Sequence, residues 1–234
     1  MNIACVTTYN EAQTIQSLVR GLTAYGNVDR VVIVDAASID GTQSLIKDLT
    51  IGKSHEVEGT DLVLTESRNV SSILYQHRVA YSPALLHAFK VAMGFDPAAI
   101  LQIDAGGSHD PADAPRLLAA LKDNRLVIGS RFCRGAQYKG SRRRWLSRLY
   151  SIVASVRYRR WINDWTSGYR VFSPSLVRAL LNHGYKAQMH GFNAEVLKTA
   201  FSLGSRVTEV PITYQAGRSS FNWTGAREAL EVLA

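Results

Sequence analysis

Three side chains that could do chemistry stand at the ends of apolar runs. Asp35 ends the run VVIVD, Asp104 ends AILQID, and Arg131 ends LVIGSR. Short apolar runs of this kind are typical of buried strands in a parallel sheet, and ligands of open α/β sheets lie beyond the carboxyl ends of the strands. One such residue alone could simply cap a helix. Three at equivalent strand ends predict that they converge on one ligand-binding crevice.

The elements that would position these residues alternate along the chain. Residues 2–8 and 31–35 have the composition of buried strands, and each is followed by a helical pattern. Further strands are predicted at 62–66, 99–104, 126–131 and 206–214. Helices are predicted at EAQTIQSLVRGL, at 42–49, 83–94, 175–182 and 192–203, and from Pro111 onward. This order predicts an α/β fold with a mostly parallel sheet and right-handed crossovers.

Length and composition favour one globular domain over residues 1–234. The chain is 46% hydrophobic and 20% charged, enough apolar material for a sizeable core. Two cysteines make no disulfide framework, which favours a reducing compartment, the cytoplasm. The first residues lack the pattern of a signal peptide, and no apolar run approaches the ~20 residues that span a bilayer. We therefore expect a soluble protein or one bound peripherally to a membrane.

The charge of the chain favours anionic partners. Lys and Arg number 27 against 19 Asp and Glu, a net charge of +8. The stretch 141–161 combines many arginines with apolar residues at helical spacing: Trp145, Leu149, Ile152, Val153 and Val156. Three interpretations stay open here. The stretch could be an amphipathic helix at an anionic lipid surface, an ordinary core-facing helix with a solvated basic side, or a nucleic-acid groove.

Two common nucleotide-binding classes are disfavoured. A dinucleotide-binding oxidoreductase needs a G-x-G-x-x-G turn after its first strand, but the turn here reads TTYNEAQ and has no glycine. The phosphate-binding run G-x-x-x-x-G-K-[ST] is absent as well.

Six short motifs occur in an order that is similar to a known family: TTYNEAQTI, VVIVDAASIDGT, LQIDAGGSHDPADAPRLL, VIGSR, DWTSGYRVF and TEVPITY. The chain resembles family-2 glycosyltransferases from about residue 3 to about residue 230, and most of all the polyprenol (dolichyl) phosphate mannosyl- and glucosyltransferases. The resemblance implies a GT-A fold, with a Rossmann-like half over about 1–110 that binds the nucleotide and an acceptor half over about 111–234.

The resemblance also implies a nucleotide-sugar site that is formed by Thr7, Tyr9, Glu11, Asp35, Asp104, Ala105, Arg131 and Arg218. The first three would cradle the base and ribose, and Asp35 would contact the base. Asp104 would hold Mg²⁺ or Mn²⁺ against the diphosphate, and the two arginines would contact phosphate. Such cations are needed because the leaving diphosphate gains negative charge as the glycosidic bond breaks.

The acceptor decides whether a general base is needed in an inverting transfer. A polyprenyl phosphate, the acceptor that the resemblance implies, is already anionic, whereas a hydroxyl acceptor requires a carboxylate within hydrogen-bond reach. Asp164 and Glu195 are the candidates, and together with Asp104 they complete the predicted catalytic set. Both also have structural interpretations: Asp164 could orient the WTSGYR turn and Glu195 could pair with a basic neighbour. Sugar transfer to nucleic acid or to another hydroxyl compound stays open.

The sequence departs from the family pattern at both acidic motifs. Gly106 stands where the second acid of Asp-x-Asp is expected, and Ala36 stands where Asp-Asp-Gly-Ser has its second acid. His109 could contribute a ligand or simply pack. These losses motivate a third alternative, a nucleotide-sugar-binding homologue without catalytic activity.

Overall fold

The computed structural model describes residues 1–50, 53–56, 62–67, 69–122, 125–140, 144–189, 191–216 and 223–233. Its strands are β1 Asn2–Thr8, β2 Arg30–Asp35, β3 Lys53–Glu56, β4 Leu62–Glu66, β5 Val70–Tyr75, β6 Ala99–Asp104, β7 Leu126–Ser130, β8 Gln137–Lys139, β9 Arg170–Phe172, β10 Val207–Pro211 and β11 Thr213–Gln215. Its α-helices are α1 Ile15–Ala24, α2 Thr42–Leu49, α3 Tyr81–Met93, α4 Ala114–Ala119, α5 Arg144–Tyr158, α6 Pro174–Leu181, α7 Phe192–Ser202 and α8 Trp223–Leu233. A short 3-10 helix, Pro111–Asp113, precedes α4.

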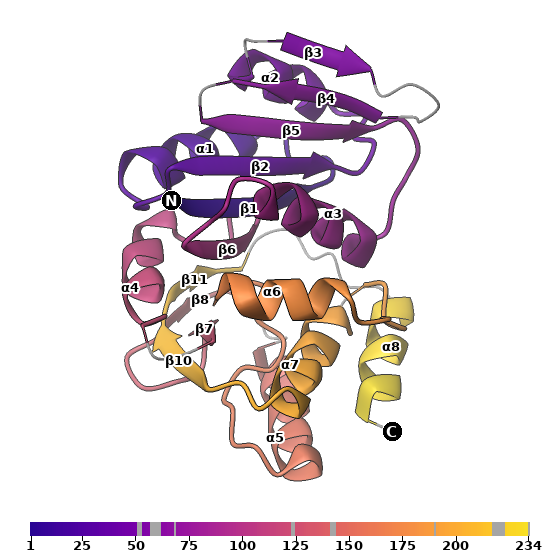
Figure 1. Ribbon diagram of the computed structural model, residues 1–234. Coiled ribbons are helices and arrows are strands. Elements are labelled where there is room, and N and C mark those ends of the chain that lie inside the picture. Colours follow the sequence, from indigo (N-terminus) through magenta and orange to yellow (C-terminus); the bar gives the residue numbers. More distant parts are fainter. Residues whose placement is uncertain are drawn as a thin grey trace.

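One mixed sheet runs through both halves of the chain, in the order β10-β7-β9-β6-β1-β2-β5-β4-β3 (Figure 1). The strands that end in predicted site residues pair in parallel, β6 with β1 and β1 with β2. Two strands run against this direction: β9 between β6 and β7, and β4 between β5 and the edge strand β3. The predicted, mostly parallel α/β sheet is therefore confirmed.

Alternation along β1 builds a core on each face of the sheet. Ile3 and Cys5 pack into a core covered by α3, α6 and α7, with contributions from α5 and α8. Ala4 and Val6 pack into the other core, under α1, α2 and α4. Figure 1 shows these two helical layers with the sheet between them. Strands covered on both sides carry continuous apolar runs, which is why the sequence pattern located them.

The predicted strand over 206–214 is two strands in the structure. β10 pairs with β7, and β11 pairs with β8 in a separate small sheet. The chain changes sheets at Ile212, whose N–H donates to the carbonyl of Ser130 at 3.2 Å and whose carbonyl accepts from Gln137 at 3.0 Å. This change brings Tyr214 toward the end of β6, where it forms a β-bridge with His109.

Within the described residues, no helix has both the length and the apolar character needed to cross a membrane.

Candidate functional site

The registers of three neighbouring strands place the predicted acidic residues at one sheet edge. Thr8 at the end of β1 is the partner of Asp35 on one side, and Thr7 is the partner of Asp104 on the other. Two strand spacings, roughly 10 Å, therefore separate the backbones of the two aspartates. Thr7 and Asp104 are partly exposed, whereas Asp35 and Ala105 are buried.

The loops after β1 and β2 are joined by hydrogen bonds. The Asn10 amide donates to the Ser38 hydroxyl at 2.8 Å, and the Ile39 amide donates to the Asn10 side chain at 2.9 Å. The Glu11 amide donates to the Thr42 hydroxyl at 2.9 Å. These bonds make the loop of Tyr9 and Glu11 continuous with the one that follows Asp35.

The Asp35 carboxylate is hydrogen-bonded within the loop that follows it. It accepts hydrogen bonds from the amide of Ser38 at 2.9 Å, from its hydroxyl at 2.5 Å, and from Gln43 at 2.8 Å. Asn10 and Ala37 both have left-handed backbones, with φ of 58° and 64°. For an alanine this conformation is strained, and such strain concentrates at functional loops.

A third loop contributes a residue that the sequence analysis missed. The guanidinium of Arg78, which follows β5, lies 3.1 Å from the ring centroid of Tyr9 and contacts the carbonyl of Ala36 at 3.5 Å. It is exposed. The available signal was the run SSILYQHR, in which a cation follows a short strand, but its two serines obscure the apolar pattern.

Asp104 is held between α3 and the turn that precedes β9. Tyr81 donates to its carboxylate at 3.3 Å, and Gln102 in turn donates to Tyr81 at 2.7 Å. Burial, and then the charge of Asp104, raise the pKa of Tyr81 well above its usual value, so the phenol stays a donor. On its other side the carboxylate lies against the backbone of Gly168, where an added Cβ would be only 2.6 Å from Oδ2.

Arg131 and Asp164 form a buried bidentate pair. The Nε and Nη2 atoms of Arg131 lie 2.7 Å from the two oxygens of Asp164, and Nη2 also donates to Thr166 at 2.6 Å. Burial alone would raise the pKa of Asp164, but the charge and hydrogen bonds of Arg131 hold it below its usual range. Since both oxygens are engaged, this geometry favours the orienting role over proton transfer. The catalytic role of Asp164 stays a prediction.

A second buried cation supports the same turn. Arg170 on β9 donates to the carbonyls of Trp165, Ser167 and Asn193 at 2.7–2.9 Å. Burial lowers its pKa to about 10, so it remains charged at neutral pH. No local sequence pattern indicates a role for Arg170, because its partners meet it only after folding.

Two further predicted site residues are Glu195, which the structure describes, and Arg218, which it does not. The Glu195 carboxylate accepts from the amides of Lys186 and Ala187, the latter at 2.9 Å, and so anchors the segment before α7. Its catalytic role also stays a prediction. Arg218 lies outside the described residues.

His109 packs within the site. Its ring lies 5.1 Å from that of Tyr169 and 5.3 Å from that of Tyr214, and neither nitrogen has a hydrogen-bond partner among the described residues. Burial lowers its pKa to about 4, although nearby Asp104 and Asp164 act in the opposite direction. His109 is therefore neutral at physiological pH.

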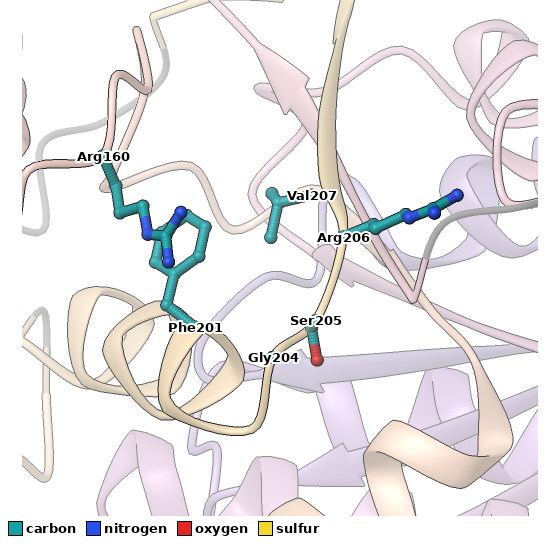
Figure 2. Close-up of a pocket in the computed structure, with 6 residues that line it drawn as sticks. All are labelled: Arg160, Phe201, Gly204, Ser205, Arg206 and Val207. Atoms are coloured by element: carbon teal, nitrogen blue, oxygen red, sulfur yellow. The ribbon is translucent and has the colours of Figure 1, made fainter.

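A pocket lies at the start of β10, at the opposite end of that strand from Pro211 (Figure 2). It is lined by Arg160, Phe201, Gly204, Ser205, Arg206 and Val207. Figure 2 shows Arg160 lying along Phe201, at 5.4 Å from the ring centroid, while Arg206 points away. The pocket is formed by none of the predicted site residues.

The family model for glycosyl transferase family 2 matches residues 3–181. The chain belongs to this family. Its activity is therefore that of a glycosyltransferase, and the resemblance predicted from the six motifs is confirmed.

Two relatives act, by name, on polyprenyl phosphates. An undecaprenyl-phosphate mannosyltransferase of Micrococcus luteus is 27% identical, over 91% of this chain and 82% of its own length. A polyprenol monophosphomannose synthase of Mycolicibacterium smegmatis is 26% identical, over 99% of this chain and 85% of its own length.

Solved structures confirm the GT-A fold of this family-2 member. Glucosyl-3-phosphoglycerate synthase of Mycobacterium tuberculosis in complex with UDP superposes with a TM-score of 0.70 at 17% identity, over all of this chain and 78% of that one. The same enzyme with Mn²⁺, UDP and glucosyl-3-phosphoglycerate gives a TM-score of 0.68.

Proposed function

We propose that this glycosyltransferase moves a sugar, with inversion, from a GDP- or UDP-sugar to a polyprenyl phosphate. An acceptor phosphate oxygen forms the new bond to the anomeric carbon, and the bond to the diphosphate breaks as the nucleoside diphosphate leaves. The relatives named for polyprenyl phosphates support this acceptor. The carrying observation is the strand register that sets Asp35 and Asp104 at one edge beside the Tyr9 loop.

The engagement of the candidate bases supports an anionic acceptor over a hydroxyl. Asp164 is paired with Arg131, and Glu195 is bound to backbone amides. Asp164 is a poor proton acceptor in this pair, since Arg131 stabilises its charged form and holds its pKa below the usual range. A lipid phosphate requires no general base at neutral pH, whereas a hydroxyl group on a sugar or on a modified nucleobase does.

A divalent cation fits the residues that are present. A Cβ added at Gly106 would lie only 3.1 Å from Oε1 of Glu11, so the Glu11 carboxylate lies next to the position of the missing acid. We propose that Asp104 and Glu11 together hold Mg²⁺ or Mn²⁺, with oxygens of the diphosphate completing the shell. Among the described residues no cluster of three metal-ligating side chains occurs, so two carboxylates are the proposed set. When bound, the cation would neutralise charge on the leaving diphosphate.

The remaining roles fall to the chain's own residues. Tyr9 and Arg78 would lie against the nucleotide base. Asp35 would order the loop that contacts the base, and Ala105 would lie close to the sugar. Arg131 would direct positive potential toward the phosphates while remaining paired. Arg218 is proposed as a further phosphate contact on the resemblance alone. The proposed place of action is the cytoplasmic side of a membrane, with the chain bound peripherally.

Transfer of label tests the proposal. Radiolabelled GDP-mannose, UDP-glucose and UDP-N-acetylglucosamine are each incubated with undecaprenyl phosphate in detergent or with duplex DNA. Label is then counted in the organic phase of the first reaction and in the precipitated DNA of the second. Label in the lipid is expected with one donor, and Asp104→Ala should abolish it. Transfer to DNA but not to lipid would overturn the acceptor. Donor binding without release of nucleoside diphosphate in either arm would identify an inactive homologue.

A further inference from the structure

Helix α5 turns its apolar face outward. The residues that it buries are small or polar: Ser151, Ala154 and Ser155. Five large apolar side chains are exposed instead, by 44–67%: Trp145, Leu149, Ile152, Val153 and Val156. An ordinary surface helix shows the reverse arrangement. The core-facing interpretation of the 141–161 stretch is therefore wrong.

Hydrogen bonds fix this orientation. Ser151 accepts from the amide of Trp165 at 3.1 Å, and Ser155 accepts from the indole of Trp165 at 2.9 Å while donating to the carbonyl of Ile162 at 2.9 Å. Trp165 is fully buried. Rolling the helix to bury its apolar stripe would break these buried bonds, so the outward face belongs to the folded state.

Positive charge borders the stripe on both sides. At 3.6 residues per turn, Arg148 and Arg157 lie roughly a quarter turn to either side of its centre, and both are exposed. Trp161, 76% exposed, continues the surface beyond the end of the helix. The sequence from 141 to 161 contains no acidic residue. This charge pattern complements an anionic surface.

We propose that the outer face of α5 inserts into the headgroup layer of an anionic lipid bilayer. Fifteen residues make a helix about 22 Å long, shorter than the ~30 Å hydrocarbon core, so it would lie in the plane of the membrane. Apolar side chains enter the acyl boundary, arginines meet lipid phosphates, and tryptophans sit at headgroup depth. The inference deepens the proposed function, because it brings the enzyme to the surface where a polyprenyl phosphate would lie.

A second copy of the chain fits this face less well. A twofold interface would set α5 against itself or its close surroundings, and the arginine borders of both copies would then meet. Like charges brought together in this way oppose association. Lipid phosphates place the opposite charge at the same positions.

Vesicle binding tests the inference without donor or acceptor, so it can fail independently of the proposed function. The purified chain is sedimented with vesicles of phosphatidylcholine alone or mixed with phosphatidylglycerol. We expect binding to the anionic vesicles only, with a blue shift of tryptophan fluorescence, and weaker binding at about 0.5 M than at about 0.1 M salt.

Variants locate the contact. Trp145→Glu and Val156→Glu should each lower the partition coefficient about tenfold or more, because an apolar side chain of that size is removed from the nonpolar phase. Tyr25→Glu is the matched control: Tyr25 is 55% exposed beside α1, on the other face of the sheet, and should bind as wild type. Circular dichroism melts verify folding, which exposed positions should preserve.

Two results would overturn the inference. One is vesicle binding that Trp145→Glu and Val156→Glu leave unchanged. The other is a wild-type chain that does not bind anionic vesicles. In that case, light scattering that shows a dimer in the wild type and monomers in these variants would identify a second copy as the occupant of this face.

Discussion

The substitution Gly168→Ala tests the position of Asp104 directly. The backbone of Gly168 does not have a positive φ, so alanine is compatible with its conformation. The added Cβ would nevertheless lie 2.6 Å from Oδ2 of Asp104 and 3.2 Å from its Cγ. This is about 1 Å less than the ~3.5 Å at which nonbonded atoms attract. The carboxylate must therefore move by up to about 1 Å.

The expected loss follows from that displacement. Misplacing a catalytic group by ~1 Å costs on the order of 100-fold in rate, or about 2.7 kcal/mol of transition-state stabilisation. We expect kcat/KM for sugar transfer to fall by this factor in Gly168→Ala. Gly184→Ala is the matched control, since nothing lies within 4 Å of its added Cβ and its φ is not positive. It should retain wild-type kcat/KM.

The stability of a double variant separates contact from unfolding. Overpacking should cost Gly168→Ala about 1–3 kcal/mol of unfolding free energy in urea. In an Asp104→Ala background the carboxylate is gone, so the same change should cost almost nothing. Full activity in Gly168→Ala, or an equal cost in both backgrounds, would refute the placement of Asp104 against this turn.

Four further outcomes are expected. Ala37→Gly should raise the unfolding free energy in urea by up to ~1 kcal/mol, because it removes a left-handed alanine, and a loss of stability would contradict this. The folded pKa of His109, about 4 against the usual 6.5, means that unfolding takes up a proton between these values; stability should fall by about 3 kcal/mol as the pH drops through that window, and His109→Phe should abolish this part of the pH slope. Arg131→Lys should cost about 1–3 kcal/mol in thermal unfolding, since an ammonium makes no bidentate pair with its buried carboxylate partner. Glu11→Gln should weaken Mn²⁺ binding, in the presence of nucleoside diphosphate, at least about tenfold in an electron paramagnetic resonance titration of free Mn²⁺; an unchanged affinity places the cation elsewhere.

The strands that carry the acidic residues could be predicted because their signal is local. β1 and β6 have the predicted bounds, and β2 begins one residue earlier, at Arg30. Each is a mostly apolar run, buried on both faces, that stops at a polar residue, and Gln102 is the one polar side chain inside β6. Since parallel strands share a carboxyl edge, their order in the sequence was enough to bring Asp35 and Asp104 together.

The strands between and beside them were harder to predict. β5 carries buried Ser71 and Ser72 in the middle of its run, so the apolar pattern is broken and Arg78 after it received no role. β9 is three residues long and begins with the buried Arg170. The burial of Arg170 depends on carbonyl groups that come together only in the folded chain, so no local sequence pattern predicts this strand.

Which way the apolar face of α5 points could not be predicted from the sequence either. Helical spacing states which side chains share a face, but the same stripe could face the core or the solvent. The hydrogen bonds of Ser151 and Ser155 to the Trp165 segment decide between them. Trp165 belongs to the DWTSGYRVF motif, in which the sequence suggested a role for Asp164 alone.

The same motif links the candidate site to the exposed apolar face of α5. Asp164 pairs with Arg131 at the site, and its neighbour Trp165 holds α5 with the apolar face outward. If the acceptor were a soluble hydroxyl compound, the enzyme would need a free base, and Asp164 is engaged; it would also have no use for an exposed apolar helix. An anionic acceptor dissolved in a bilayer removes the first requirement and explains the second feature. Both observations, made on neighbouring residues of one turn, thus support the proposed lipid phosphate acceptor.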